Sequence, residues 1–146
     1  MLYDAFDPLL VQLAETTGIP AYAWNTIQSE KDATQKAPCI LVSPGKAKRQ
    51  QTQGSAHAFT PKTLWTETWQ IVVLVKGAWR EGRALGFATE ASPYVEATIC
   101  ALAGFKTDPD AQPFYIGDAI TPRLFANMAA FELSASRNVI VKKPVP

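Results

Sequence analysis

The segment Leu64–Gly77, LWTETWQIVVLVKG, constrains the fold of this chain more than any other. It combines two tryptophans, four residues apart, with an unbroken aliphatic run, Ile71–Val75. In an extended conformation its alternate side chains fall on two faces. One face carries Trp65, Glu67, Trp69, Ile71, Val73 and Val75, and the other carries Thr66, Thr68, Gln70, Val72 and Leu74.

The second of these faces is polar at its start and apolar further along. A strand of about 11 or 12 residues would also be longer than the usual strand of about 5 to 6. We therefore predict one long strand that is wet on one side at its start and is covered by helices or a neighbouring element further along. Its two tryptophans then serve as packing residues or as interface anchors.

The length and composition of the chain fit one domain without a strong charge bias. A chain of 146 residues buries a single core, so we expect one domain over 1–146. The net charge of +1, with 18% charged and 47% hydrophobic residues, argues against general disorder and against a strongly basic overall surface. Ile71–Val75 is far shorter than the roughly 20 residues that cross a bilayer. Asp4 and Asp7 stand where a secretory signal carries basic residues, so we expect a soluble, intracellular protein without a membrane partner.

Hydrophobic periodicity and turn residues predict the order of the remaining elements. The predicted elements are a helix over 2–17, or from an Asp7–Pro8 cap, that ends at Gly18; a strand over 21–27; a loop over 28–36; a strand over 37–43; a turn-rich connection over 77–91; a helix from Ser92–Pro93 to Gly104; a turn over 105–112; strands over 114–120 and 128–136; and a further strand in 137–143. Runs of strands broken by two helices predict an α+β fold, with a mainly antiparallel β-sheet and two helices packed on one face.

The cysteines and the single histidine give no support for catalysis. Cys39 and Cys100 each lie among apolar neighbours, which predicts buried, reduced thiols. His57 is the only histidine and lies in a polar segment, where a solvent-exposed side chain is expected. A dyad of Cys39 and His57 is disfavoured, because an apolar strand would desolvate the thiolate that a nucleophile needs.

The carboxylates and glycines likewise lack a recognisable catalytic or metal-binding pattern. Asp108 and Asp110 flank a proline in a turn and lack the further oxygen ligands that a calcium loop requires. The other acidic residues, including Glu67, are scattered singly. The sequence contains none of the glycine-rich nucleotide-binding motifs and no nucleophile elbow. We therefore expect no enzyme, and no catalytic, metal or cofactor-binding residues and no cofactor.

A basic segment over 44–63 is the candidate for interactions. Between Ser43 and Thr63 there are four basic residues and no acidic one. A segment of this length with few apolar side chains is either a solvated loop or a protruding hairpin that contacts a partner, such as an anionic surface or nucleic acid. The candidate interaction residues are Lys46, Lys48, Arg49, Lys62, Trp65 and Trp69.

The sequence as a whole resembles the tail terminator proteins of long-tailed bacteriophages, of the Mu-like prophage and lambda-like types. The resemblance rests on the opening amphipathic helix, the strand PCILV, the strand TWQIVVLV, and the helix ending ICALAGF before a turn and two strands. It implies an α+β subunit of a homo-oligomeric ring, commonly a hexamer, that closes the tail tube and joins it to the head connector. The implied partners are other copies of the chain, tail tube and head-connector proteins, and DNA that passes through the lumen. The implied locations are the bacterial cytoplasm during assembly and the virion tail.

Three alternatives remain open at the level of sequence. The first is a nucleic-acid-binding module that uses the basic segment 44–63, with Phe59 and Trp65 as stacking surfaces. The second is another phage neck or tail-completion protein. The third is a small enzyme or ligand-binding domain whose site the fold assembles from unlinked residues. The connection over 77–91 is longer than a simple tail terminator requires, and Trp79 within it has no derived role.

Overall fold

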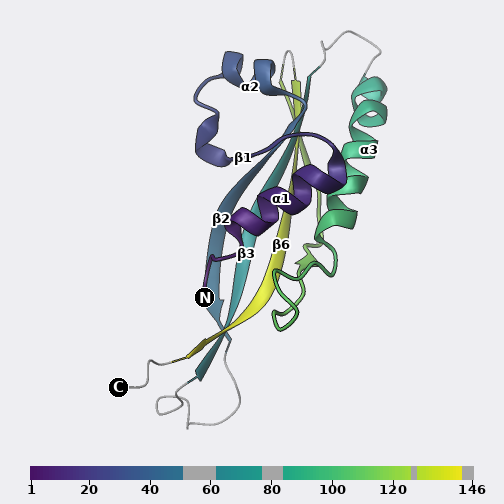
Figure 1. Cartoon of the computed structure of the whole chain (residues 1–146). Coiled ribbons are helices and arrows are strands. Elements are labelled where there is room, and N and C mark those ends of the chain that lie inside the picture. Colours follow the sequence, from purple (N-terminus) through teal and green to yellow (C-terminus); the bar gives the residue numbers. More distant parts are fainter. Residues whose placement is uncertain (51–61, 77–83, 126–127, 143–146) are drawn as a thin grey trace.

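The computed structural model describes residues 1–50, 62–76, 84–125 and 128–142, without the side chains of Lys62 and of residues 84–89. The helices in this part of the chain are α1 (Phe6–Thr17), α2 (Glu30–Lys36) and α3 (Ala84–Leu102), with a short 3-10 helix, η1 (Trp24–Thr26). The strands are β1 (Ala21–Ala23), β2 (Cys39–Arg49), β3 (Lys62–Lys76), β4 (Tyr115–Ile116), β5 (Thr121–Leu124) and β6 (Met128–Lys142). Figure 1 shows the helices packed against one elongated sheet.

The six strands form one sheet in the order β1-β2-β3-β6-β4, and β5 also pairs with β6. β1 and β2 run parallel, whereas the other pairs are antiparallel. The described chain thus has an α+β fold with a mainly antiparallel sheet, which confirms the predicted fold class.

The long strand β3 has the two faces that its sequence predicts. On the first face, the side chains from Glu67 to Val75 are buried, and on the second face Gln70 is exposed. Further along the second face, Val72 and Leu74 pack in an apolar cluster. β3 is therefore open to water on one side at its start and covered on both sides near its end, as expected.

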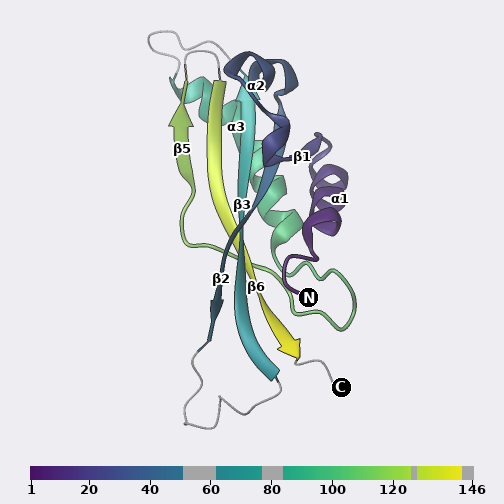
Figure 2. The same ribbon diagram turned by 90° about the vertical axis from the view of Figure 1, so that its left-hand side faces the viewer.

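Helices cover both faces of the sheet. Leu13 of α1 and Leu102 of α3 belong to the larger core cluster, together with Ile71 on the first face of β3. Ala33 of α2 instead packs in the cluster that contains Leu74, on the second face. Figure 2 shows α2 and α3 on opposite sides of the upper ends of the long strands. The prediction of two helices on one face is thus right for α1 and α3, but it omits α2.

The prediction of a loop over 28–36 was wrong, because this polar run contains α2. The Ser29 hydroxyl accepts a hydrogen bond from the Asp32 backbone N–H at 3.1 Å, which caps the helix. Acidic residues in the first turn and Lys36 in the last turn match the helix dipole. Only Ala33 is buried, so α2 has no apolar stripe that hydrophobic periodicity could detect.

The first helix and strand differ from the prediction in their bounds. α1 begins at Phe6, and Ala5 rather than Asp7 is its N-cap residue. Its end is as predicted, because Gly18 adopts the left-handed conformation (φ 75°) that favours glycine after a helix. The predicted strand over 21–27 is shortened to β1, since the residues that follow form η1.

α3 begins well before the predicted start at Ser92–Pro93, and Pro93 lies inside it. Proline in a helix interior removes a hydrogen bond and costs about 3 kcal/mol. Ala91 and Val95, four residues apart, are nevertheless both buried, so the packed face of the helix continues across the proline. The predicted connection over 77–91 was therefore too long. Its first part, 77–83, lies outside the described residues, as does 51–61.

The C-terminal strands also correct the prediction. Of the predicted strand over 114–120, only β4 pairs in the sheet. β5 was not predicted, because its side chains are all exposed and show no alternation. β6 is one continuous strand, where a strand over 128–136 and a further strand in 137–143 were predicted. Its alternating buried positions run through Leu133 and Arg137 to Val139 without interruption.

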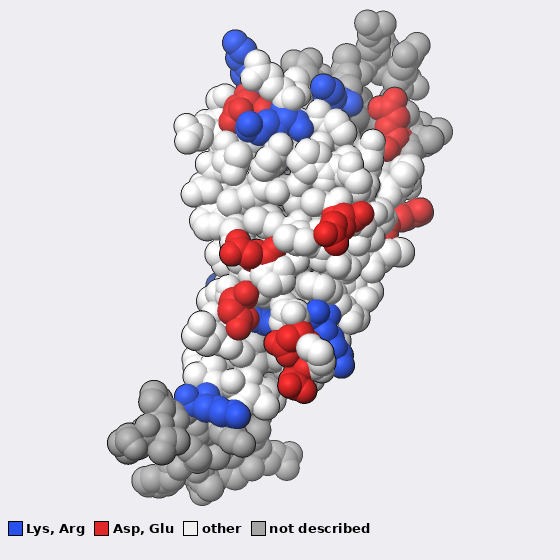
Figure 3. Space-filling view, viewed as in Figure 1, with Lys and Arg blue, Asp and Glu red and all other residues white. Residues whose placement is uncertain are grey.

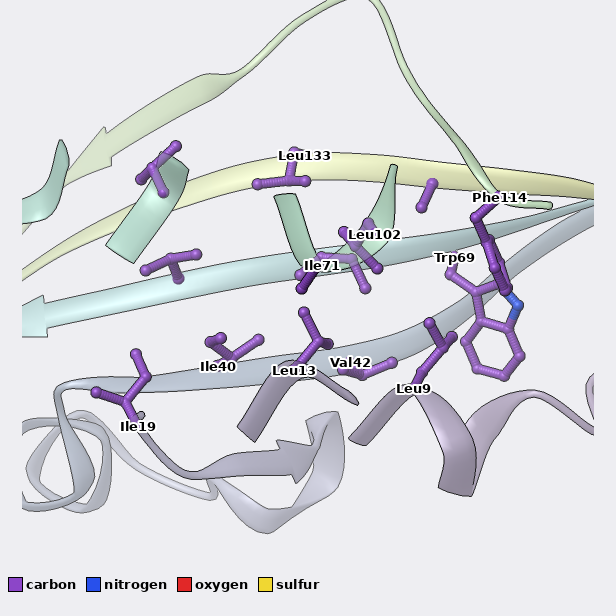
Figure 4. Packing of buried hydrophobic residues seen from close by; sticks show 14 of the residues in the cluster. Leu9, Leu13, Ile19, Ile40, Val42, Trp69, Ile71, Leu102, Phe114 and Leu133 are labelled. Atoms are coloured by element: carbon purple, nitrogen blue, oxygen red, sulfur yellow. The ribbon is translucent and has the colours of Figure 1, made fainter. Parts of the chain in front are cut away.

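The core lies between the first face of the sheet and the two longer helices. Figure 4 shows Leu9 and Leu13 directed at Ile71 and Val42, with Trp69 and Phe114 at one end of the cluster. No helix in the described residues combines the length and the apolar character needed to span a membrane.

The two cysteines have different environments. Cys39 is buried, as predicted, and burial raises the pKa of its thiol to about 11 against the opposing charge of Lys36. Cys100 is exposed, so the prediction that it is buried was wrong. Its apolar neighbours in α3 face the core while its own position on the helix faces solvent, which the local composition could not indicate.

Candidate functional site: the three-stranded arm

The three long strands continue past the helices as a narrow extension, which we call the arm (Figures 1 and 2). The arm consists of residues 45–49 of β2, 62–67 of β3 and 137–142 of β6. The rest of the sheet, with the helices that cover it, is the body. The two described ends of the basic segment 44–63 are thus antiparallel strands. The connecting residues, with His57 and Phe59, lie outside the described part of the chain.

Three of the predicted interaction residues are exposed along β2. Lys46, Lys48 and Arg49 belong to its second half, and their side chains reach solvent. None of the three forms an ion pair within the described residues. Lys62 begins β3 opposite Lys142 of β6. The arm therefore carries a row of unneutralised positive charge on its β2 side.

The two tryptophans, by contrast, have different surroundings. Trp69 is 1% exposed and stacks on Phe6 with ring centroids 5.9 Å apart. Trp65 is only half-buried in the arm, where its indole N–H donates to the Thr63 hydroxyl at 2.8 Å. Its strand position is opposite Arg49. Trp69 is therefore a packing residue. Trp65 is partly accessible to solvent, so the predicted role of interface anchor remains a prediction for this residue.

A buried ion pair lies at the base of the arm, where the arm meets the body. Glu67 is fully buried on the first face of β3, and its Oε1 lies 3.1 Å from Nε of Arg137 on β6. The same carboxylate accepts hydrogen bonds from the Trp69 indole N–H and from the Tyr3 backbone N–H. A buried charge requires such partners, because desolvation of an unpaired ion is very costly. Three donors thus hold Glu67 in place at the base of the arm.

Arg137 extends this network to two further segments. Its guanidinium hydrogen-bonds to Asp4, and it lies 3.3 Å from the Thr107 hydroxyl in the loop after α3. The guanidinium also lies over the ring of Phe114, 5.5 Å from its centroid. Partial burial raises the pKa of Asp4, but the hydrogen bonds and positive charges of Arg137 and the N-terminal ammonium together outweigh burial, so the pKa lies below its usual value of 3.8. The network therefore fastens the N-terminal segment and this loop to the sheet.

The N-terminal segment also contacts β2 where that strand is irregular. The Tyr3 hydroxyl donates to the Gly45 carbonyl at 2.7 Å, and the register of β2 against β3 shifts between Pro44 and Ala47. A Cβ on Gly45 would lie 2.8 Å from the Thr68 carbonyl oxygen. This position therefore requires glycine, because the two backbones approach too closely for a side chain.

The second face carries a group of uncharged polar side chains where the arm joins the body, next to Lys48, which is paired with Thr66. The Thr68 and Ser136 hydroxyls hydrogen-bond at 2.9 Å across β3 and β6. The Gln50 amide donates to the Thr66 hydroxyl at 2.7 Å and to the Asn138 side-chain oxygen at 3.0 Å. These cross-strand pairs form a polar ladder on the part of this face that lies outside the apolar cluster of α2. The ladder itself is fitted to water or to a polar partner, whereas Ile140, further along the same face, is apolar and 50% exposed.

An open pocket of about 310 Å³ lies along the outer edge of β6. The lining residues are Met1, Asp4, Thr107, Asp108, Asp110, Ala111, Gln112, Arg137, Asn138, Val139, Ile140 and Lys142. Consecutive residues of β6, which point to opposite faces, share in this lining. The edge of the strand itself is therefore one wall of the pocket. Figure 3 shows several acidic side chains at the height of the arm's base.

No protein-family model matches the chain, and a comparison with curated proteins gives no significant match. In the described residues no group of three or more His, Cys, Asp or Glu side chains could hold a metal ion.

The structure brings the predicted basic residues and Trp65 together on the arm, and it separates Trp69 from them. Sequence reasoning did not anticipate the pair of Glu67 and Arg137. A signal was nevertheless present, because each residue occupies the buried register of an apolar strand, between Trp65 and Trp69 and between Ala135 and Val139. Two opposite charges in such positions on neighbouring strands indicate a buried ion pair.

Proposed function

We propose that the protein is a self-assembling structural subunit, a tail terminator of a phage or prophage. In this role it forms a ring at the end of the tail tube and joins the tube to the head connector. The observation that carries the proposal is the arm, in which three strands leave the body with both outer edges unpaired among the described residues.

Unpaired edges of this kind favour assembly over a role as an isolated monomer. A sheet edge exposes backbone donors and acceptors that pair readily with another strand, and monomeric proteins usually shorten or cover such edges. β6 instead continues for six residues beyond its last contact with β4, at Ser136. The α+β fold is also the one that the resemblance implies. Both features support a subunit whose sheet is completed by neighbours.

The native mass of the purified chain over a concentration series tests the proposal. We expect a discrete species that grows from 15.9 kDa toward a closed ring, visible as rings of one diameter by electron microscopy. Addition of a phage tail tube protein should stabilise the ring. A chain that remains monomeric up to millimolar concentration, with and without that tube protein, contradicts the proposal.

A nucleic-acid-binding module is the second candidate, and the exposed row of Lys46, Lys48 and Arg49 favours it. Such a module binds through phosphate contacts, so its affinity falls steeply with salt. The test is a mobility shift with single- and double-stranded DNA at low and high salt, for the wild type and for a variant with all three residues replaced by alanine. A salt-sensitive shift that the variant loses supports this candidate, and the absence of a shift at low salt removes it.

A further inference from the structure

The outer edge of β6 has backbone groups that no strand of the described chain satisfies. Gly117 N–H donates to the Ser134 carbonyl at 2.8 Å, so even-numbered residues of β6 direct their backbone groups outward. By the alternation of an antiparallel ladder, Asn138, Ile140 and Lys142 do the same. All three line the pocket. The pocket is therefore a slot beside an open strand edge, a geometry that accepts an added strand.

The carboxylates of the pocket suit a basic strand. Asp4 is already paired with Arg137, but Asp108 and Asp110 form no ion pair within the described residues. Lys142 lines the pocket too, at the end of β6. Two free carboxylates thus face a slot whose opening follows the strand edge.

The opposite edge of the same arm carries the complementary charge. Beyond its pairing with β1 at Ala21–Ala23, β2 has no neighbour on its outer side in the described chain. This free part contains Lys46, Lys48 and Arg49, all exposed. One molecule therefore presents a basic strand edge on one side and, on the other, a slot of mixed charge that contains the two carboxylates of Asp108 and Asp110 without an ion-pair partner among the described residues.

The two edges also lie at the same height along the strands. Ala47 of β2 is paired with Glu67, which is paired with Arg137 of β6. Arg49 is likewise level with Val139, through Trp65. Rotation of a copy about an axis parallel to the strands, without translation, brings its basic edge level with the slot of its neighbour. Because β2 and β6 have the same direction, the added strand would run parallel to β6.

We infer that the β6 slot of one copy binds the β2 edge of a second copy, so that the arms join into one continuous sheet. The inference rests on the self-assembly proposed above and specifies its interface. The contact is heterologous, since different edges meet, and heterologous contacts close into rings when the rotation permits. The polar ladder of Thr68, Ser136 and Asn138 then lines one surface of the joined sheet.

Charge exchange between the two edges tests this pairing. The edge variant is Lys48→Glu with Arg49→Glu, and the slot variant is Asp108→Lys with Asp110→Lys. Each alone should raise the dissociation constant of self-association by about 100-fold, because like charges face each other. An equimolar mixture should assemble to within about tenfold of the wild type, since the acidic edge of one variant meets the basic slot of the other.

Matched controls carry the same charge changes elsewhere on the exposed surface. Lys31→Glu with Lys76→Glu controls for the edge variant, and Glu15→Lys with Glu96→Lys controls for the slot variant. Both controls should assemble as the wild type does. Thermal unfolding of each variant checks that its fold is intact.

A cross-link provides a second measurement that does not depend on charge. In a Cys100→Ser background, Lys48→Cys with Asn138→Cys places one thiol on each edge, because both residues are level with Thr66 and lie on the same face of the sheet. Oxidation should yield a covalent ladder of oligomers, whereas either single cysteine should stop at a dimer or fail to link.

The outcomes separate this inference from the proposed function. If the wild type forms rings but both charge variants also do, and no ladder appears, the edge pairing is wrong and the ring stands. If each variant is monomeric and the mixture does not recover, the pairing is also contradicted. A wild type that never assembles contradicts both proposals.

Discussion

The body and the arm share three strands, yet they differ in what lies over them. In the body, the sheet has α1 and α3 on one face and α2 near the end of the other. In the arm, no helix covers the strands (Figures 1 and 2). Only the N-terminal segment and the loop after α3 reach its base. The body is therefore a buried core, whereas the arm is a surface with two free edges.

The composition of one strand accounts for this difference. β3 is apolar on both faces from Ile71 to Val75, whereas before that its second face carries Thr66, Thr68 and Gln70. Two apolar faces require cover on both sides, and one apolar face requires it on a single side. The change along the strand therefore matches the extent of the apolar cluster that α2 covers on the second face.

The largest difference in stability between body and arm should appear when each of the two tryptophans is replaced by alanine. Trp69→Ala should destabilise the protein by about 4–5 kcal/mol, because it opens a cavity in the core and removes a donor from Glu67. Trp65→Ala should cost about 1–2 kcal/mol, because this side chain is half-buried. Urea unfolding of both variants measures the difference. Equal losses would show that the arm is as tightly packed as the body.

Loss of the buried ion pair at the base of the arm should reduce the free energy of unfolding by an intermediate amount. Arg137→Met should cost about 3 kcal/mol, because it leaves Glu67 buried without its counter-ion. Lys142→Met, on the same strand but exposed, should change the free energy of unfolding by less than about 0.5 kcal/mol. The double variant Glu67→Leu with Arg137→Met should be more stable than Arg137→Met alone, and the reverse order would refute a paired charge.

The smallest effect should come from the acid titration of Asp4. Its folded pKa is below the usual 3.8, so its contribution is fully present above pH 3.8 and is lost as the pH falls through the folded value. Asp4→Asn should remove that contribution at pH 7. The difference in unfolding free energy between wild type and variant should therefore be constant down to about pH 4 and vanish below the folded pKa. A difference that grows on acidification would be incompatible with this assignment.

The sequence was sufficient for the elements whose burial leaves a periodic pattern. The apolar residues of α1 and the two faces of β3 follow from side-chain spacing, and the first half of β2 follows from its short apolar run. α2 was not predicted because it depends on a cap and on one buried alanine rather than on an apolar stripe. The start of α3 was predicted too late because proline is favoured in the first turn of a helix, and Pro93 was therefore assigned to that turn. β5 depends wholly on its neighbour β6 for its structure.

The candidate site was predictable in its residues but not in its arrangement. The basic row of β2 is visible as Lys46, Lys48 and Arg49 without nearby acids. Its counterpart, Asp108 and Asp110, lies some sixty residues later and reaches the opposite edge only through the order of strands in the sheet. Sequence spacing carries no information on that order, so the complementarity of the two edges required the structure.

The ladder between β3 and β6 has a mechanical consequence. Its register runs from Lys62 opposite Lys142 to Lys76 opposite Met128 without a shift, whereas β2 is interrupted beside Gly45. At about 3.3 Å per residue, these fifteen pairs form a stiff beam of roughly 50 Å. A force applied at the tip of the arm is therefore transmitted along this beam into the body, while β2 bends independently at its bulge. The arm is therefore expected to be stiff along β3 and β6 and easier to bend along β2.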